Sequence, residues 1–209
     1  MGKSTAAQIL RDRGVAVVDT DDLARQADEI DEANSRLTGI RVLKGVEADI
    51  LQDGRIDFDE AVLARLDFVI ASIHSRFNMG PKEMTARMLS AMDSPHLTIV
   101  GHPTGRLLLS RDPYGLDLDA VIEKAAATGV ALEVNADPHR LDLDWRVLRR
   151  ARDRGVAISI GADAHSVAGI SNVEFGIGIA RKGWLGPDHI VNAQPLDRFL
   201  DRVARRRGG

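Results

Sequence analysis

Short apolar runs rich in β-branched residues recur along the chain, and segments with apolar residues at helical spacing lie between several of them. The runs lie at residues 15–19, 42–50, 68–74, 97–103, 131–136 and 157–165. The helical patterns lie at residues 81–92, 117–129, 142–155 and 195–207. Because the runs are continuous and do not alternate with polar residues, they are typical of strands buried on both faces. The pattern therefore predicts an α/β fold with six parallel strands covered by helices.

Polar side chains stand at or near the ends of five of these runs. They are Glu47, His74, His102, Asn135 and Asp163. Their spacing of 27 to 33 residues corresponds to one βα unit per step. Because parallel strands point the same way, we expect these side chains to gather at one carboxyl-terminal rim, where (βα) barrels keep their chemistry.

The last run continues into Asp163-Ala-His165, which places two strong metal ligands at one strand end. A single histidine at a strand end is more often a hydrogen-bonded structural residue than a ligand. Acidic and imidazole groups from several strands at one rim would be costly to desolvate unless a cation joins them. The combination therefore predicts a metal site.

Composition narrows the chemistry of such a site. The sequence has 209 residues and no cysteine, which excludes disulfides, thiolate zinc sites and cysteine nucleophiles. The net charge of −3 and the 4% aromatic content predict neither a broad cationic surface nor a stacking platform for nucleic acid. No apolar run approaches the roughly 18 residues that cross a bilayer, so we expect a soluble, cytoplasmic protein.

From about Ala24 onward the chain resembles the C-terminal PHP (polymerase and histidinol phosphatase) domain of bacterial and archaeal family X DNA polymerases. The matching blocks are LKGVEADIL, ASIHSRFNM, GHPTGRLL, LEVNADPHRLDL, DAHS and FGIGIARKGWL. The resemblance implies an incomplete or distorted (βα) barrel of the PHP, TIM-barrel-like type. It also implies a cluster of up to three manganese, zinc or iron ions, with hydrolysis of phosphoesters as in a 3′-5′ exonuclease or 3′-phosphatase.

The same resemblance assigns roles to individual residues. It matches Glu47 to a metal-bridging glutamate, and it gives four further metal ligands: His74, His102, Asp163 and His165. Of these, Glu47, His74 and Asp163 are the predicted catalytic residues. The predicted substrate-binding residues are Arg76, Arg106, Asn135 and Arg140, with surface ion pairing as the alternative for the arginines. The expected substrate is a phosphorylated small molecule or a DNA 3′ end.

The first 23 residues instead resemble the opening of dephospho-CoA kinase, with a phosphate loop cut down to Met1-Gly-Lys-Ser4. We therefore expect two segments, residues 1–23 and 24–209, folding together as one domain. Counterparts of the PHP family's first histidines are missing. We therefore expect the site to hold one or two metal ions more readily than three. Asp19 and Asp21 could supply carboxylates in their place, with capping of the following helix as the alternative.

Two alternatives to an enzyme remain open at this point. The chain could be an inactive barrel fragment or chimera, or a remnant of a P-loop kinase that binds nucleotide. A barrel with a missing strand also exposes unpaired edges, which predicts a homo-oligomer formed across the gap. Trp184 is expected to pack in the core.

Overall fold

The computed structural model of the chain describes residues 20–208, with side chains from Asp22 onward. The chain forms two compact units, which divide between Lys44 and Gly45. The predicted strand at residues 15–19, the phosphate-loop remnant and Asp19 lie outside the described residues, as does the side chain of Asp21. The predicted division at residue 23 stays a prediction.

The smaller unit contains helix α2 (Thr20–Arg36) and the segment that leads to Lys44. The segment folds back on its helix through the Asn34 side chain, whose amide donates to Val42 O and accepts from Val42 N, both at 2.8 Å. Lys44 Nζ also pairs with Asp31 Oδ2 at 2.6 Å. These polar contacts connect residues up to 13 positions apart in a unit whose side chains are mostly exposed or half-buried, with Leu23 buried.

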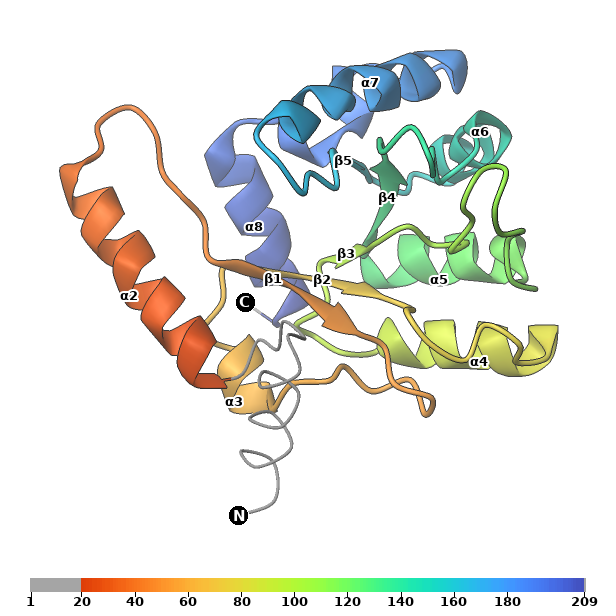
Figure 1. Ribbon diagram of the computed structural model, residues 1–209, viewed down its shortest axis with the longest axis horizontal. Coiled ribbons are helices and arrows are strands. Elements are labelled where there is room, and N and C mark those ends of the chain that lie inside the picture. Colours follow the sequence, from red (N-terminus) through yellow and green to blue (C-terminus); the bar gives the residue numbers. More distant parts are fainter. Residues whose placement is uncertain (1–19, 209) are drawn as a thin grey trace. The chain divides into compact units, whose positions relative to one another are not determined.

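The larger unit is built on a parallel sheet whose order follows the sequence (Figure 1). Its strands are β1 (Gly45–Asp49), β2 (Phe68–Ser72), β3 (Ile99–Val100), β4 (Ala131–Asn135) and β5 (Ile158–Gly161). Five of the predicted runs therefore form strands, and all their pairings are parallel. Within the described residues the sheet has five strands and does not close into a barrel.

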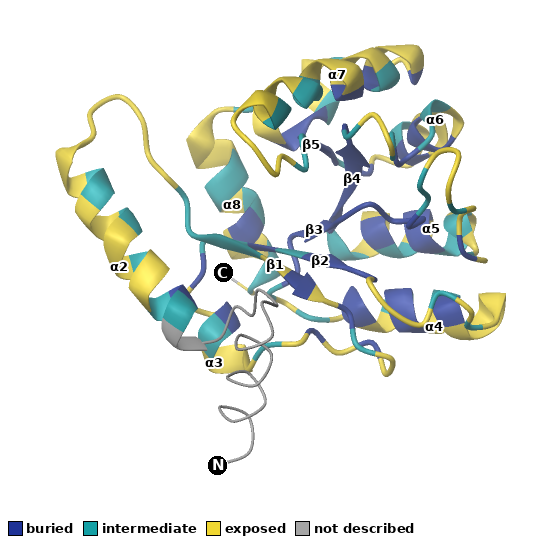
Figure 2. Ribbon diagram, in the orientation of Figure 1, coloured by how far each residue is buried: buried dark blue, intermediate teal, exposed yellow. Residues whose placement is uncertain are grey.

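In the described part of the chain, six helices follow the strands. They are α3 (Glu60–Leu63), α4 (Pro81–Ala91), α5 (Leu118–Thr128), α6 (Trp145–Asp153), α7 (Val173–Lys182) and α8 (Leu196–Arg206). Four of them (α4, α5, α6 and α8) lie in the segments where helical spacing predicted a helix, whereas α3 and α7 were not predicted. Three short 3₁₀ turns are η1 (Ala168–Asn172), η2 (Pro187–His189) and η3 (Val191–Ala193). Each of these six helices presents buried residues to the unit (Figure 2). None of the helices within residues 20–208 is both long and apolar enough to cross a lipid bilayer.

Helix α5 shows how local sequence sets these boundaries. The Asp117 carboxylate accepts the backbone N–H groups of Asp119 and Ala120 at 3.1 Å, which caps the first turn. Gly129 ends the helix at φ 76°, a left-handed conformation that glycine adopts without a steric penalty. The helix then leads directly into β4, all five residues of which are buried. Continuous apolar character thus corresponds to a strand covered on both faces.

Helix α8 covers the amino-terminal end of the sheet. Its Arg206 donates to the backbone carbonyls of Leu97, which precedes β3, and Thr128, which precedes β4, at 3.2 and 2.8 Å. The same guanidinium donates to Met92 O at 3.2 Å and to Ser94 O. One side chain therefore satisfies four carbonyls at this end.

Trp184 corrects one expectation, because 72% of it is exposed. Helix α7 ends at Lys182, and Trp184 follows with a φ of 62°. This left-handed turn buries Leu185 and leaves the indole outside. The prediction that Trp184 packs in the core was wrong, since the turn that ends the helix decides which side chain faces inward.

Candidate metal centre

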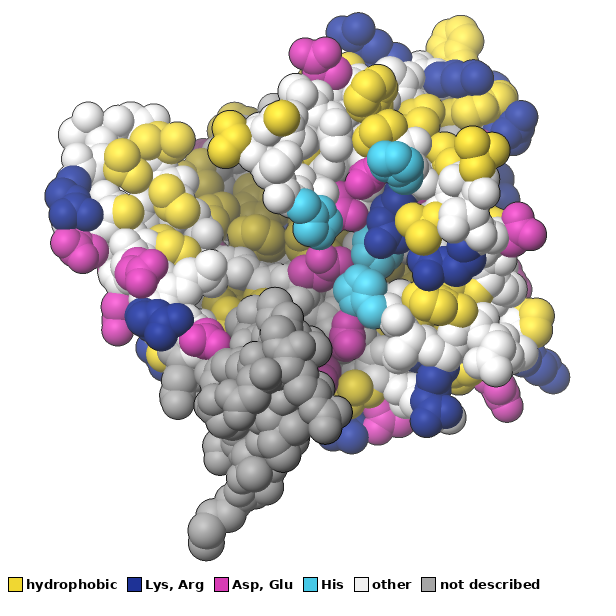
Figure 3. All heavy atoms as spheres, viewed as in Figure 1, with side chains coloured by type: hydrophobic (Ala, Val, Ile, Leu, Met, Phe, Trp, Pro, Cys, Tyr) yellow, Lys and Arg dark blue, Asp and Glu magenta, His cyan; other side chains and the backbone are white. Residues whose placement is uncertain are grey.

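Three of the predicted ligands converge where β1, β2 and β3 end. The side chains of Glu47, His74 and His102 form a metal-site candidate in which one ligand atom of each lies within 4.8 Å of the others. We call these residues the triad. His102 is 3% exposed, whereas Glu47 and His74 are accessible from one side. In Figure 3, histidine and acidic side chains lie next to one another on the face shown.

The spacing of the triad atoms fits a shared cation. His102 Nε2 lies 3.1 Å and His74 Nε2 3.5 Å from Glu47 Oε1, and the two Nε2 atoms are 3.2 Å apart. Ligands bound at about 2.1 Å in tetrahedral or octahedral geometry lie about 3.0 to 3.4 Å from each other. Two imidazole nitrogens and a carboxylate oxygen are also a donor set that zinc, manganese and iron accept.

Asp49 orients His74 for such a role. Its Oδ1 accepts a hydrogen bond from His74 Nδ1 at 2.5 Å. A carboxylate on Nδ1 fixes the neutral tautomer with its lone pair on Nε2, which faces the triad. Hydrogen bonds to Glu47 and then to Asp49 raise the pKa of His74. Without a cation, His74 therefore keeps its second proton to a higher pH than a free imidazole does.

Glu47 is correspondingly acidic. Hydrogen bonds from His102, and then from His74 and Ser72, hold the pKa of its carboxyl far below the ordinary value. The Ser72 hydroxyl donates to Glu47 Oε1 at 2.6 Å. The carboxylate is therefore ionised over the working range of proteins, as a metal ligand must be.

A buried carboxyl group on β4 holds the backbone of one triad residue in place. Glu133, in the middle of β4, accepts the backbone N–H of His102 on its Oε2 at 2.6 Å. Burial raises the pKa of Glu133 to about 7. On the same histidine, Nδ1 is buried and has no hydrogen-bond partner among the described residues. The contact fixes the backbone at His102, which has an unusual φ of 24°.

Two glycines make room for these carboxylates. A Cβ on Gly101 would overlap the Ser72 hydroxyl, and one on Gly161 would overlap Oε1 of Glu133. Neither glycine has a positive φ, so the requirement is space and not conformation. Any larger residue would displace the groups that hold the triad.

The predicted ligands after β5 lie in a different arrangement. The Asp163 carboxylate accepts Asn135 Nδ2 at 2.9 Å and pairs with Arg140 Nε at 3.3 Å. His165 is exposed over 85% of its side chain, and its Nδ1 lies 2.9 Å from the Asp163 carbonyl. Neither residue is part of the triad in this structure. Their role as ligands stays a prediction.

The predicted substrate-binding residues differ in how exposed they are and in how many protein contacts their side chains already make. Arg76 is exposed at φ 56°, two positions after His74. Arg106 is half-buried and donates to the backbone carbonyls of Arg140, at 3.0 Å, and Leu141. Asn135 is buried, and its Oδ1 accepts the Asp137 N–H at 3.0 Å. Arg76 is thus the predicted arginine with most freedom to reach a ligand.

Sequence reasoning missed Asp49 and Glu133. Asp49 lies two positions after Glu47 on β1, so both side chains point to the same face of the strand. Glu133 is the charged residue within the otherwise uncharged strand Ala131–Asn135. A carboxyl enclosed by apolar strand residues is costly unless it has a specific partner, and that signal was present in the sequence.

The chain is similar in sequence to several known proteins. It is 44% identical over 183 residues to the DNA polymerase/3′-5′ exonuclease PolX of Bacillus subtilis, covering 86% of the chain. It is also 30% identical over 179 residues to a probable phosphatase of Syntrophotalea carbinolica, and 31% identical over 173 residues to one of Caldicellulosiruptor bescii. Each of these two matches covers 79% of the chain. No family model matches the chain.

The chain covers a different share of the length of each relative. The chain spans 32% of the length of PolX, but 70% and 69% of the two probable phosphatases. The homology to PolX supports the PHP-like domain predicted from the sequence. The kinase-like start at residues 1–23 has no support from these matches and stays a prediction. Because it matches the probable phosphatases over more than two thirds of their length, the chain belongs to their family.

Proposed function

We propose that the chain is a metal-dependent phosphoesterase that holds one divalent cation at the triad and could hold a second beside it. Its substrates would be a phosphorylated small molecule or the 3′ end of DNA. The observation that carries the proposal is the spacing of 3.1 to 3.5 Å between the triad's ligand atoms. Relatives named 3′-5′ exonuclease and probable phosphatase support a phosphoesterase-type activity.

Glu47, His74 and His102 are the proposed ligands of one cation, which would be manganese, zinc or iron. Asp163 and His165 are proposed for a second. When bound, such cations supply positive charge that activates a water molecule and stabilises the charge on a phosphate ester.

The protein groups have separate tasks in this proposal. Glu47 stays ionised because the two imidazoles lower the pKa of its carboxyl. Asp49 holds the His74 ring so that Nε2 faces the cation. Arg76 would place its guanidinium on phosphate oxygens, since the planar group matches them in a bidentate manner. Arg140 remains a second candidate for this contact once a cation competes for Asp163.

Metal content and hydrolysis test the proposal together. The purified chain is loaded with manganese, passed over a desalting column and assayed for retained metal. Hydrolysis of p-nitrophenyl phosphate and of a 3′-phosphorylated oligonucleotide is then measured. We expect retained manganese and turnover, and we expect His74→Ala and His102→Ala to abolish both. His139→Ala is the matched control for metal content, because that side chain is 83% exposed and outside the triad.

The outcomes separate the alternatives. A chain that retains no metal, or that retains the same amount after His74→Ala, would contradict the metal site itself. Retained metal without hydrolysis of either substrate would favour the inactive fragment over the enzyme.

A further inference from the structure

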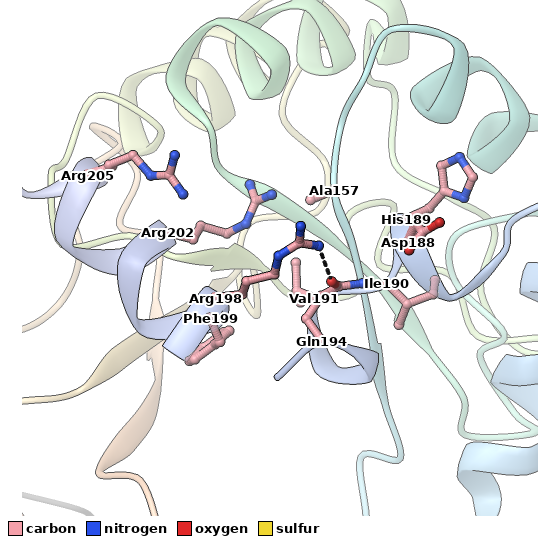
Figure 4. A pocket seen from close by; sticks show the side chains of 10 residues that line it. All are labelled: Ala157, Asp188, His189, Ile190, Val191, Gln194, Arg198, Phe199, Arg202 and Arg205. Carbon is pink, nitrogen blue, oxygen red and sulfur yellow. Dashed lines mark hydrogen bonds between the residues drawn. The ribbon is translucent and has the colours of Figure 1, made fainter. Parts of the chain in front are cut away.

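A hollow lies beside Ala157, at the start of β5, and Figure 4 shows the side chains that line it. Its volume is about 240 Å³, and helix α8 and the segment carrying η2 and η3 form its walls. Ala157, which lines it, directly precedes β5, whereas the predicted ligand Asp163 follows the strand. The volume is below the roughly 300 to 1,000 Å³ of pockets for whole drug-sized ligands, so it suits one small group.

Three arginines of α8 face this hollow. Arg198, Arg202 and Arg205 are spaced at i, i+4 and i+7, which places them on one side of the helix, and all three line the hollow. At about 1.5 Å per residue, they span about 10 Å along the helix axis. Figure 4 shows the three side chains following one another along α8, opposite the wall that carries His189.

No acidic group among the described residues neutralises these arginines. Arg198 donates to Gln194 Oε1 at 2.9 Å, Arg202 to the Gly129 carbonyl at 3.4 Å, and Arg205 to its helix backbone at 3.3 Å. Each of these three acceptor oxygens is neutral, and none of the three arginines forms an ion pair within residues 22–208. Asp188 is the one carboxylate in the lining. Three positive charges therefore face one negative charge.

The electrostatics of Arg202 reflect this imbalance. Burial, and then the charge of Arg205, lower the pKa of its guanidinium. Like charges held together in a partly buried place raise the free energy of the fold unless an anion joins them. The hollow therefore has the charge of an anion site as well as its size.

The opposite wall carries two polar side chains, His189 and Gln194. His189 Nδ1 lies 3.0 Å from the backbone nitrogen of Gly186 and 3.2 Å from its carbonyl oxygen. Gln194 donates its amide N–H to Pro187 O at 2.7 Å, which turns its oxygen toward Arg198. Both residues are therefore held in fixed orientations next to the guanidinium groups.

A second hollow continues the arginine-lined surface. Arg202 and Arg205 also line a neighbouring hollow of about 280 Å³, together with Thr128, Gly129 and Arg206. The cationic surface thus extends beyond the reach of a single small anion. A chain of phosphates could follow it, because guanidinium forks bind successive phosphate oxygens.

We propose that the hollow between α8 and the η2–η3 segment is a binding site for a phosphate group, separate from the metal centre. The phosphate would be inorganic phosphate or part of the backbone of a single-stranded oligonucleotide. The forked guanidinium of arginine matches phosphate geometry and stays charged at any physiological pH. Phe199 packs edge-on against Phe68 at 5.8 Å, so the site offers charge and no base stacking.

The first test follows backbone amide chemical shifts of the isotope-labelled chain in EDTA, at constant ionic strength. Titration with inorganic phosphate should shift the amides around Gln194 and Gly129 and leave those around His74 unchanged. The double variant Arg198→Ala with Arg202→Ala should bind at least about tenfold more weakly, because it loses two charge-assisted contacts. Arg181→Ala, at an exposed position outside the hollow, removes one charge as a control.

A second variant guards against a loss of folding. Arg198 and Arg205 are both exposed, so Arg198→Glu with Arg205→Glu reverses the local charge without opening the core. It should abolish the shifts while leaving the rest of the spectrum in place. His74→Ala should bind phosphate like the parent chain, which separates this site from the proposed function.

The second arm uses a short fluorescein-labelled single-stranded DNA, with binding followed by anisotropy in EDTA. Arginine-dependent binding of the DNA assigns the site to a nucleic-acid backbone, and shifts with inorganic phosphate alone assign it to free phosphate. The proposal is overturned if neither probe binds, if the double variant binds like the parent chain, or if the shifts map to the triad.

Discussion

Replacing the buried carboxyl of Glu133 by an amide should change how stability depends on pH. Glu133→Gln keeps an oxygen for the His102 N–H, which Glu133 accepts at 2.6 Å. In the unfolded chain this carboxyl titrates near its ordinary value of 4.5, whereas burial raises its pKa in the fold to about 7. The folded state therefore binds the proton more tightly. Its contribution to stability is fully present below pH 4.5 and is lost as the pH rises through about 7.

The magnitude follows from the two values. A difference from 4.5 to about 7, at about 1.4 kcal/mol per pH unit, corresponds to about 3.5 kcal/mol in total. Part of this is already lost at pH 5, so about 2 to 3 kcal/mol separates pH 5 from pH 8. We expect the parent chain to lose this much free energy of unfolding relative to Glu133→Gln over that interval.

Urea unfolding of both chains in EDTA, followed by the fluorescence of Trp145 and Trp184, measures the difference. EDTA is required because a cation next to Glu47 would also favour the ionised form of Glu133. Glu174→Gln, at an exposed position, is the matched control and should leave the pH dependence unchanged. Parallel stability curves for the parent chain and Glu133→Gln would refute the reasoning, because they would mean that Glu133 titrates alike in both states.

Four further predictions test the triad, the sheet end and the open edge. Asp49→Asn should weaken manganese binding by about 10- to 100-fold in a calorimetric titration, because His74 loses the carboxylate that fixes its tautomer. Manganese affinity of the parent chain should fall as the pH drops through the raised pKa of His74, since binding must release that proton. Arg206→Ala should lower the free energy of unfolding by about 2 to 4 kcal/mol, whereas exposed Arg181→Ala should change it by less than about 0.5. Light scattering should show a dimer formed across the edge of β1, and a monodisperse monomer would contradict this.

The sequence was sufficient to locate the strands of the larger unit. Runs of β-branched residues followed by helical spacing predicted β1, β2, β3, β4 and β5, because burial on both faces demands continuous apolar character. Trp184 was misplaced for a different reason. The direction of its side chain depends on a left-handed turn after α7, and hydrophobicity alone does not encode that turn.

The candidate metal site also contains residues that the sequence could place and one that it could not. Glu47, His74 and His102 could be located from their places at the ends of neighbouring strands, where the backbone itself brings them together. Asp163 lies beyond its strand at φ 48°, and its carboxylate turns to Asn135 and Arg140. That choice depends on competition between partners that become neighbours only in three dimensions. The spacing of the strands thus predicts the position of a ligand residue in the sheet, but not the hydrogen-bond partner of its side chain.

The two ends of the sheet carry side chains of opposite charge. The carboxyl ends of the strands hold Glu47, Asp49 and Glu133, which attract cations, whereas α8 presents guanidinium groups to the amino ends. Strand β5 connects the two ends, because it begins at the hollow beside Ala157 and ends before Asp163, the predicted ligand that lies outside the triad. Charges on opposite ends of a strand are screened by salt over about 8 to 10 Å. Cation binding at one end and phosphate binding at the other should therefore be nearly independent, and saturation with manganese should leave the affinity of the arginine-lined hollow unchanged.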